Sequence, residues 1–185
     1  MNPIDDFLLD NVLPDKKPLT LAPQANLLAS ELALMDCGEI SLLIPTNEII
    51  SLVSAQQLVA QPQSSFDCGY LEFEQQYYSI FCFNKSLQLQ PSMNPESTTM
   101  VLFNAQNILF GVCCHELTKQ NATGLTFHAV PPSMRSRKQP FTEFAILDNR
   151  AVGLSSVAAL IALLRLRGAK LISQPGPASA LLGAG

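Results

Sequence analysis

One place in the sequence puts nucleophilic and basic side chains side by side, at Cys113-Cys114-His115. In an extended strand, residues 113 and 115 point to the same face, so a thiol and an imidazole could act together as nucleophile and base. A metal site is not expected, because the only other histidine is His128 and the cysteines show no CxxC spacing. The favoured interpretation is that the cysteines are small buried hydrophobic residues, and an enzyme using this triplet remains an alternative.

The carboxylate pairs give no stronger sign of catalysis. Asp5 and Asp6 lie in a proline-rich leader, while Glu72 and Glu74 flank an expected hairpin turn, so solvated charge is the default interpretation of both pairs. The sequence also contains no glycine-rich phosphate loop, no dinucleotide-binding fingerprint and no GxSxG element. These patterns favour a protein that is not an enzyme and needs no cofactor.

Composition limits the class of protein further. Of the 185 residues, 48% are hydrophobic and 14% are charged, which excludes a disordered chain and predicts a well-filled core. The net charge of -4 argues against nucleic acid as a partner, although Arg135, Arg137 and Lys138 form a local basic patch. No basic leader and no bilayer-length apolar run are found, so we expect a cytoplasmic protein without direct membrane insertion.

The elements that must position these groups are mainly strands. Four prolines punctuate residues 1–30, which predicts an N-terminal extension ahead of the main fold. From residue 31 onward, short apolar runs separated by polar turns predict a mostly β fold of the sandwich or barrel kind. We expect three hairpins and one further strand, with the hairpins over 32–44, 69–83 and 100–117 and the strand over 141–147.

Two helical segments are also expected. Asn47 is a plausible cap for one helical turn over 47–53, between the first two hairpins. A longer helix should begin at Ser155 or Ser156, run to Leu166 and stop at Gly168. The expected organisation is therefore an extension over 1–30, a domain over 31–168 and a flexible tail over 169–185.

Four sequence blocks follow one another in a fixed order. The blocks are Ile44-Pro45-Thr46-Asn47-Glu48-Ile49-Ile50-Ser51-Leu52, then 69–75 with 78–83, then 100–103 with 110–115, and last 146–150 with 157–160. Together they resemble the CheW-like family over residues 31–165. The resemblance implies two small five-stranded SH3-like β-barrels, packed around a shared apolar seam and carrying a few short helices.

The resemblance also implies a function. It predicts a non-enzymatic adaptor that couples the cytoplasmic tip of a chemoreceptor to a CheA-type histidine kinase, in chemotaxis or in twitching motility driven by type IV pili. Such a protein would be cytoplasmic, associated with membrane receptor arrays, and would work through its surfaces rather than through a catalytic group.

The same resemblance points to partner-binding residues near the groove between the barrels and at exposed strand edges, namely Ile49, Ser51, Tyr70 and Glu74. Glu74 stands where the family usually has an arginine, and Ser51 replaces a customary glutamate. Like charges that meet at an interface can cost several kcal/mol, so the usual contact need not survive this charge reversal. The alternative function is a divergent stand-alone regulator that binds a different protein or a small ligand.

Overall fold

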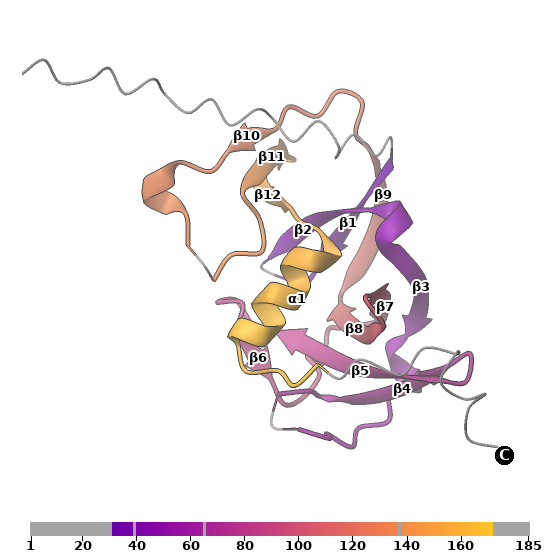
Figure 1. Ribbon diagram of the computed structural model, residues 1–185. Helices are drawn as coiled ribbons and strands as arrows, with labels where there is room; N and C mark the ends of the chain where they lie inside the picture. The colour runs from indigo at the N-terminus through magenta and orange to yellow at the C-terminus, as the bar shows by residue number, and fades with distance from the viewer. Residues whose placement is uncertain (1–30, 39, 65, 137, 172–185) are drawn as a thin grey trace, which may run out of the picture.

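The computed structural model describes residues 31–171 except 39, 65 and 137, and shows two curled β-sheets with one α-helix beside them (Figure 1). The predicted mostly β, CheW-like fold is confirmed. The expected N-terminal extension and residues 172–185 of the expected tail lie outside the described residues. Within those residues, no helix has the length and apolar character needed to cross a bilayer.

The first sheet combines strands from the beginning and the end of the domain. Its order is β10-β11-β12-β2-β1-β9, and neighbouring strands are antiparallel except for the parallel pair of β12 and β2. The strands are β1 (Glu31–Asp36), β2 (Ser41–Pro45), β9 (Glu116–Asn121), β10 (His128–Ala129), β11 (Glu143–Leu147) and β12 (Arg150–Leu154).

The second sheet is built from the middle of the chain. Its order is β3-β7-β8-β5-β4, with the short β6 paired to β5, and its one parallel pair joins β5 to β8. The strands are β3 (Ile49–Ser54), β4 (Gly69–Phe73), β5 (Gln76–Phe83), β6 (Leu89–Gln90), β7 (Thr99–Ala105) and β8 (Ile108–Cys114). The short 3-10 turns are η2 (Thr46–Glu48), η3 (Ala55–Gln57) and η4 (Pro132–Met134).

The three predicted hairpins are present as β1–β2, β4–β5 and β7–β8. The β4–β5 turn is formed by Glu74 and Gln75, whose φ angles are 51° and 63°. Gln106 and Asn107 likewise have positive φ and form the two-residue β7–β8 turn. The sequence pattern predicts a longer turn over 104–107. Two consecutive residues with positive φ match the right-handed twist of the strands that they join.

Two predicted elements differ from the structure. The expected helical turn over 47–53 is wrong, since η2 ends at Glu48 and the following residues pair with β7 as strand β3. The second half of the expected hairpin over 100–117 is not one continuous strand, because β8 ends at Cys114 and β9 begins at Glu116 in the other sheet. At the crossing, the His115 amide donates a hydrogen bond of 2.7 Å to the Asp36 carbonyl.

The predicted C-terminal helix is confirmed as α1 (Val157–Leu166). Ser156 caps it, since its hydroxyl oxygen accepts a hydrogen bond from the Ala159 amide at 3.2 Å. The carboxylate of Glu48 accepts a second bond, from the Val157 amide at 2.5 Å, and so ties the helix to η2. Gly168, with φ of 92°, follows the helix in the conformation that commonly ends helices.

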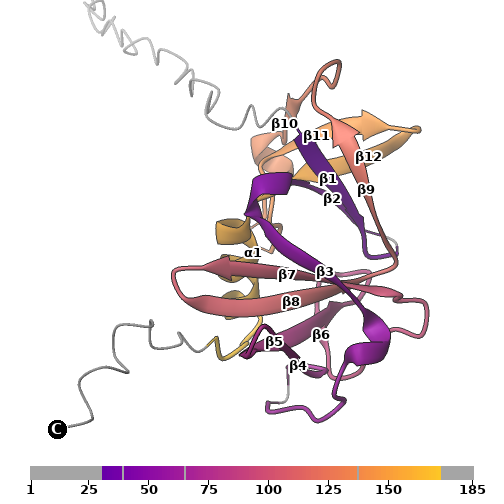
Figure 2. The ribbon, with the colours of Figure 1, turned by 90° about the vertical axis from the view of Figure 1, so that its right-hand side faces the viewer.

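The largest core joins both sheets to α1, so the predicted apolar seam is observed. Figure 2 shows the two sheets one above the other, with α1 at their side. Phe103 and Phe110 stack in this core with ring centroids 5.2 Å apart. The core takes Met35, Leu42 and Ile44 from the first sheet, Phe81, Phe103 and Phe110 from the second, and Leu160, Ile161 and Leu164 from α1. Each sheet also has a smaller core of its own.

Candidate protein-docking surface

The four predicted partner-binding residues fall at two different places in the second sheet. Ile49 and Ser51 belong to β3, whereas Tyr70 belongs to β4 and Glu74 to the turn that follows β4. In the order of the sheet, β3 and β4 are the opposite edges, with β7, β8 and β5 between them. The sheet order therefore does not bring the four residues into one continuous patch.

Strand β3 is an open edge with an apolar face. Among the described strands it pairs only with β7, and its pairing register shifts between Ile49 and Ser51. Ile49 is half-buried and packs against the main core, while Ser51 is half-buried beside it. The side chains of Ile50 and Leu52 are 49% and 50% exposed. An unpaired edge with exposed apolar side chains is a surface that a protein partner can cover.

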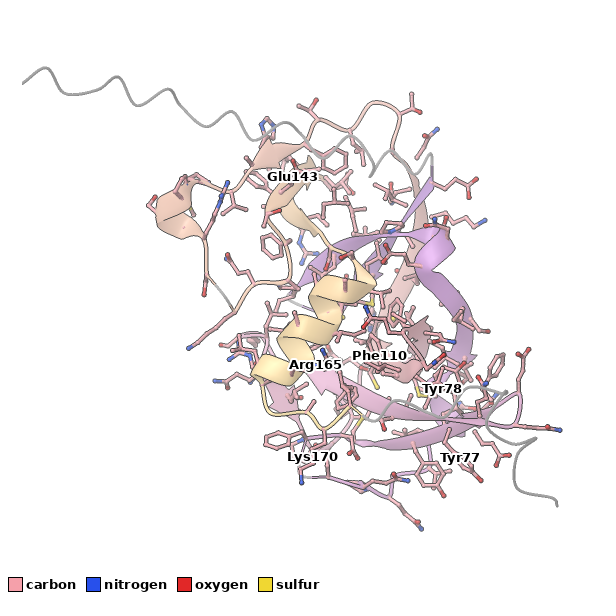
Figure 3. All side chains as sticks on the ribbon, viewed as in Figure 1. Tyr77, Tyr78, Phe110, Glu143, Arg165 and Lys170 are labelled. Atoms are coloured by element: carbon pink, nitrogen blue, oxygen red, sulfur yellow. The ribbon has the colours of Figure 1, made fainter. Side chains whose placement is uncertain are left out.

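Strand β4 presents an aromatic and acidic surface at the other edge. The rings of Tyr70 and Tyr77 lie 5.9 Å apart, and Tyr77 is 52% exposed. Val59 covers part of this edge, because its amide and carbonyl bond to the carbonyl and amide of Tyr70 at 2.9 and 3.1 Å. In Figure 3, Tyr77 lies in the part of the molecule formed by β4 and β5, away from Glu143 in the first sheet.

Glu74 lies at the tip of the β4–β5 hairpin and is exposed. Glu72, two residues earlier on β4, is also exposed, so this end of the hairpin carries two carboxylates. Burial and the nearby carboxylate of Glu74 raise the pKa of the Tyr78 phenol. The charge at this hairpin is therefore available to a partner, and it is of acidic sign.

Ile50, Leu52 and Tyr77 are surface residues that sequence reasoning missed. The sequence contained a sign that Ile50 and Leu52 share one face of a strand, because both are apolar and alternate residues of a strand lie on the same face. Assigning 47–53 to a helical turn concealed this alternation. The sequence places Tyr77 in a hairpin strand. Whether its side chain is exposed depends on which face of the sheet the rest of the domain covers.

The Cys113-Cys114-His115 triplet does not form a catalytic group. Cys113 is buried in the smaller core of the second sheet, while Cys114 is buried in the main core on the other face. Burial raises the pKa of the Cys114 thiol to about 12. His115 is exposed, and its Nδ1 lies 2.6 Å from the carbonyl oxygen of Glu96. The accessible thiol that the enzymatic alternative requires is not found at either cysteine.

A pocket of about 410 Å³ lies between the first sheet, the loop that joins β5 to β6, and the end of α1. Its lining includes three cationic residues, Lys85, Lys138 and Arg167, and among the described residues no carboxylate. One guanidinium nitrogen of Arg167 donates to the Ser86 carbonyl at 3.1 Å. The small-ligand alternative could use this pocket.

Comparison with known proteins identifies the family. The model of the CheW-like domain matches residues 31–165, and the chain therefore belongs to the CheW-like domain family. Among solved structures, the chain is similar to the scaffolding protein TtCheW from Thermoanaerobacter tengcongensis, with 10% identity and a TM-score of 0.47. That similarity covers 68% of this chain and 87% of the other. No curated protein sequence matches the chain.

Proposed function

We propose that the chain is a non-enzymatic adaptor of a chemosensory-type signalling system, which couples the cytoplasmic tip of a chemoreceptor to a CheA-type histidine kinase. Membership of the CheW-like family supports a coupling scaffold as the class of function. The system would be one that controls chemotaxis or type IV pilus twitching, and the chain would act in the cytoplasm, beside membrane receptors.

The open edge of β3 is the observation that carries this proposal. Ile50 and Leu52 project from a strand that pairs on one side only among the described residues, and each is about half exposed. A stable protein contact covers roughly 800 Å² on each partner, and exposed apolar residues supply the favourable free energy of such burial. We assign this edge, with the predicted Ile49 and Ser51, to one of the two partners.

The second partner would bind at β4, through the predicted Tyr70 and Glu74 together with Tyr77. An adaptor must hold two proteins at once, and two edges separated by three strands provide room for both. Because Glu74 reverses the charge usual in the family, this edge should favour a partner with a basic surface. Weak contacts at each edge are strengthened when many copies assemble in one array.

The test compares two variants, one at an exposed leucine of the second sheet and one at an exposed isoleucine of the first sheet. Leu52→Lys places a charge on the β3 edge, and Ile146→Lys does the same on β11, where Ile146 is 53% exposed. We expect Leu52→Lys to weaken binding of the CheA-type kinase or of the receptor tip by about tenfold or more, while Ile146→Lys binds both normally. Isothermal titration calorimetry with purified kinase and receptor fragments measures the difference.

Loss of binding in Leu52→Lys alone supports docking on β3, and altered binding in Glu74→Arg supports docking on β4. Equal losses in Leu52→Lys and Ile146→Lys would contradict the assignment of the β3 edge. If the wild-type chain bound neither fragment at low salt, the adaptor function itself would be wrong.

The pocket lined by Lys85, Lys138 and Arg167 favours one form of the alternative function, a stand-alone regulator that binds a small anion. Thermal-shift measurements with inorganic phosphate and with carboxylate ligands test it. A concentration-dependent rise in Tm that Lys138→Gln removes would favour the regulator. An unchanged Tm would argue against a ligand of this kind.

A further inference from the structure

Three cysteines of the second sheet converge on one point of its own core. The Sγ atom of Cys68 lies 3.4 Å from that of Cys82 and 3.9 Å from that of Cys113, and all three Sγ atoms lie within 4.8 Å of one another. Each of these residues is no more than 3% exposed. Isolated buried cysteines act as small apolar side chains, but a convergence of three thiols also forms a set of metal ligands.

The strand pairing brings these thiols together from distant parts of the sequence. The parallel pairing of β5 with β8 sets Phe81 beside Val112, which places the next residues, Cys82 and Cys113, side by side. Cys68 precedes β4, and its amide donates to the Ile80 carbonyl at 2.9 Å, which holds it against β5. The cluster is thus held by β5, by β8 and by the residue that directly precedes β4. Strands of a sheet are a rigid base for a ligand site.

Two thioethers increase the sulfur content of the same core. Met100 is opposite Cys113 in the pairing of β7 with β8, and it is fully buried. Met93 packs against the core from the loop that follows β6. Thiolate and thioether ligands together select soft metal ions such as Cu(I).

We propose that Cys68, Cys82 and Cys113 form a binding site for a single soft, monovalent metal ion of the Cu(I) type. The metal–sulfur distance in zinc thiolate sites is about 2.3 Å, and three sulfur atoms in a plane at that distance from one ion lie about 4.0 Å from one another. Two of the separations in the cluster, 3.4 and 3.9 Å, are close to this value, and the third is within 4.8 Å, so adjustments of the side chains complete the site. Each thiol that binds as a thiolate releases its proton to solvent.

The backbone of β5 also holds the side chain of Cys68. The thiol of Cys68 lies 3.3 Å from the Ile80 carbonyl oxygen, the same oxygen that accepts the hydrogen bond of the Cys68 amide.

Zinc fits these residues less well than a monovalent soft ion does. A structural zinc site needs four ligands, whereas the described ligand group contains the three thiols without a histidine or carboxylate. Asp67 adjoins Cys68 but is already engaged. Its carboxylate oxygens accept hydrogen bonds from the Gln63 amide at 2.9 Å and from the Ser64 hydroxyl at 2.5 Å.

The test is an anaerobic titration of the full, reduced chain with Cu(I) in the presence of a chromophoric Cu(I) chelator. We expect one ion per chain to be withdrawn from the chelator, and Cys68→Ala or Cys113→Ala to weaken the retained affinity by at least about tenfold. Cys37→Ala is the matched control, because it removes a free thiol that lies outside the cluster. Circular dichroism of each apo variant shows whether it is folded.

X-ray absorption spectroscopy of the Cu(I)-loaded wild-type chain keeps the proposal testable even if a variant fails to fold. We expect a first coordination shell made of three sulfur atoms. A shell dominated by nitrogen or oxygen, failure to compete with the chelator, or an equal loss of affinity in Cys37→Ala would overturn the proposal. None of these results depends on whether the chain binds a kinase or a receptor.

Discussion

At the scale of single residues, Glu48 acts on an element more than a hundred positions away in the chain. Its half-buried carboxylate accepts the hydrogen bond from the Val157 amide, while Ser156 caps the same helix through Ala159. The first amides of a helix have no partner within the helix, and an acidic side chain there also interacts favourably with the helix dipole. Glu48 therefore holds α1 against the junction of the two sheets.

Replacing Glu48 should lower stability without changing the fold. We expect Glu48→Ala to reduce the free energy of unfolding by about 1–2 kcal/mol, because the Val157 amide loses a charged acceptor. Glu48→Gln should lose less, since its amide oxygen can still accept the bond. Urea unfolding measures both values, with Glu72→Ala as the control for removal of an exposed carboxylate. A control loss equal to that of Glu48→Ala would contradict this role.

Residue types predicted burial of the cysteines but not their grouping. Cys82, Cys113 and Cys114 stand inside apolar runs, and the structure buries all three. The cluster with Cys68 depends on the parallel pairing of β5 with β8, which joins positions far apart in the sequence. Local patterns carry no information about that pairing, so the grouping of the three thiols could not be predicted from the sequence.

At the scale of elements, the segments defined by local turns were predicted well. Short polar turns between apolar runs favour hairpins, and the capped apolar stripe of α1 favours a helix. Strand β3 was misassigned because apolar residues at 49, 50, 52 and 53 fit a helical period as well as a strand. Its conformation is decided by pairing with β7, which follows some fifty positions later in the chain.

Strand β8 lies at the centre of the second sheet, and Gly111 allows close packing there. A Cβ atom added at this position would come within 2.6 Å of the Ile80 side chain and 2.9 Å of the Leu102 side chain. We expect Gly111→Ala to lower the free energy of unfolding by about 1–3 kcal/mol, and the larger Gly111→Val to cost more. Thermal unfolding followed by circular dichroism measures this series, and an unchanged Tm in the valine variant would be inconsistent with such packing.

At the scale of the whole molecule, the chain builds two sheets in an interleaved order. It begins the first sheet with β1 and β2, makes the whole second sheet, and then returns to complete the first with β9 to β12. Helix α1 closes the main core, in which side chains of both sheets meet. The two edges β3 and β4 are therefore fixed relative to each other by one shared core, as an adaptor that positions two partners requires.

The proposed adaptor function requires the chain to hold two signalling proteins at the same time. The most direct measurement is sedimentation velocity of the chain mixed with a receptor-tip fragment and a CheA-type kinase fragment, each labelled with a different dye. We predict that both dyes sediment together with the chain as a ternary complex, and that excess receptor fragment does not displace the kinase. Mutually exclusive binding, or no binding of either fragment, would contradict the claim.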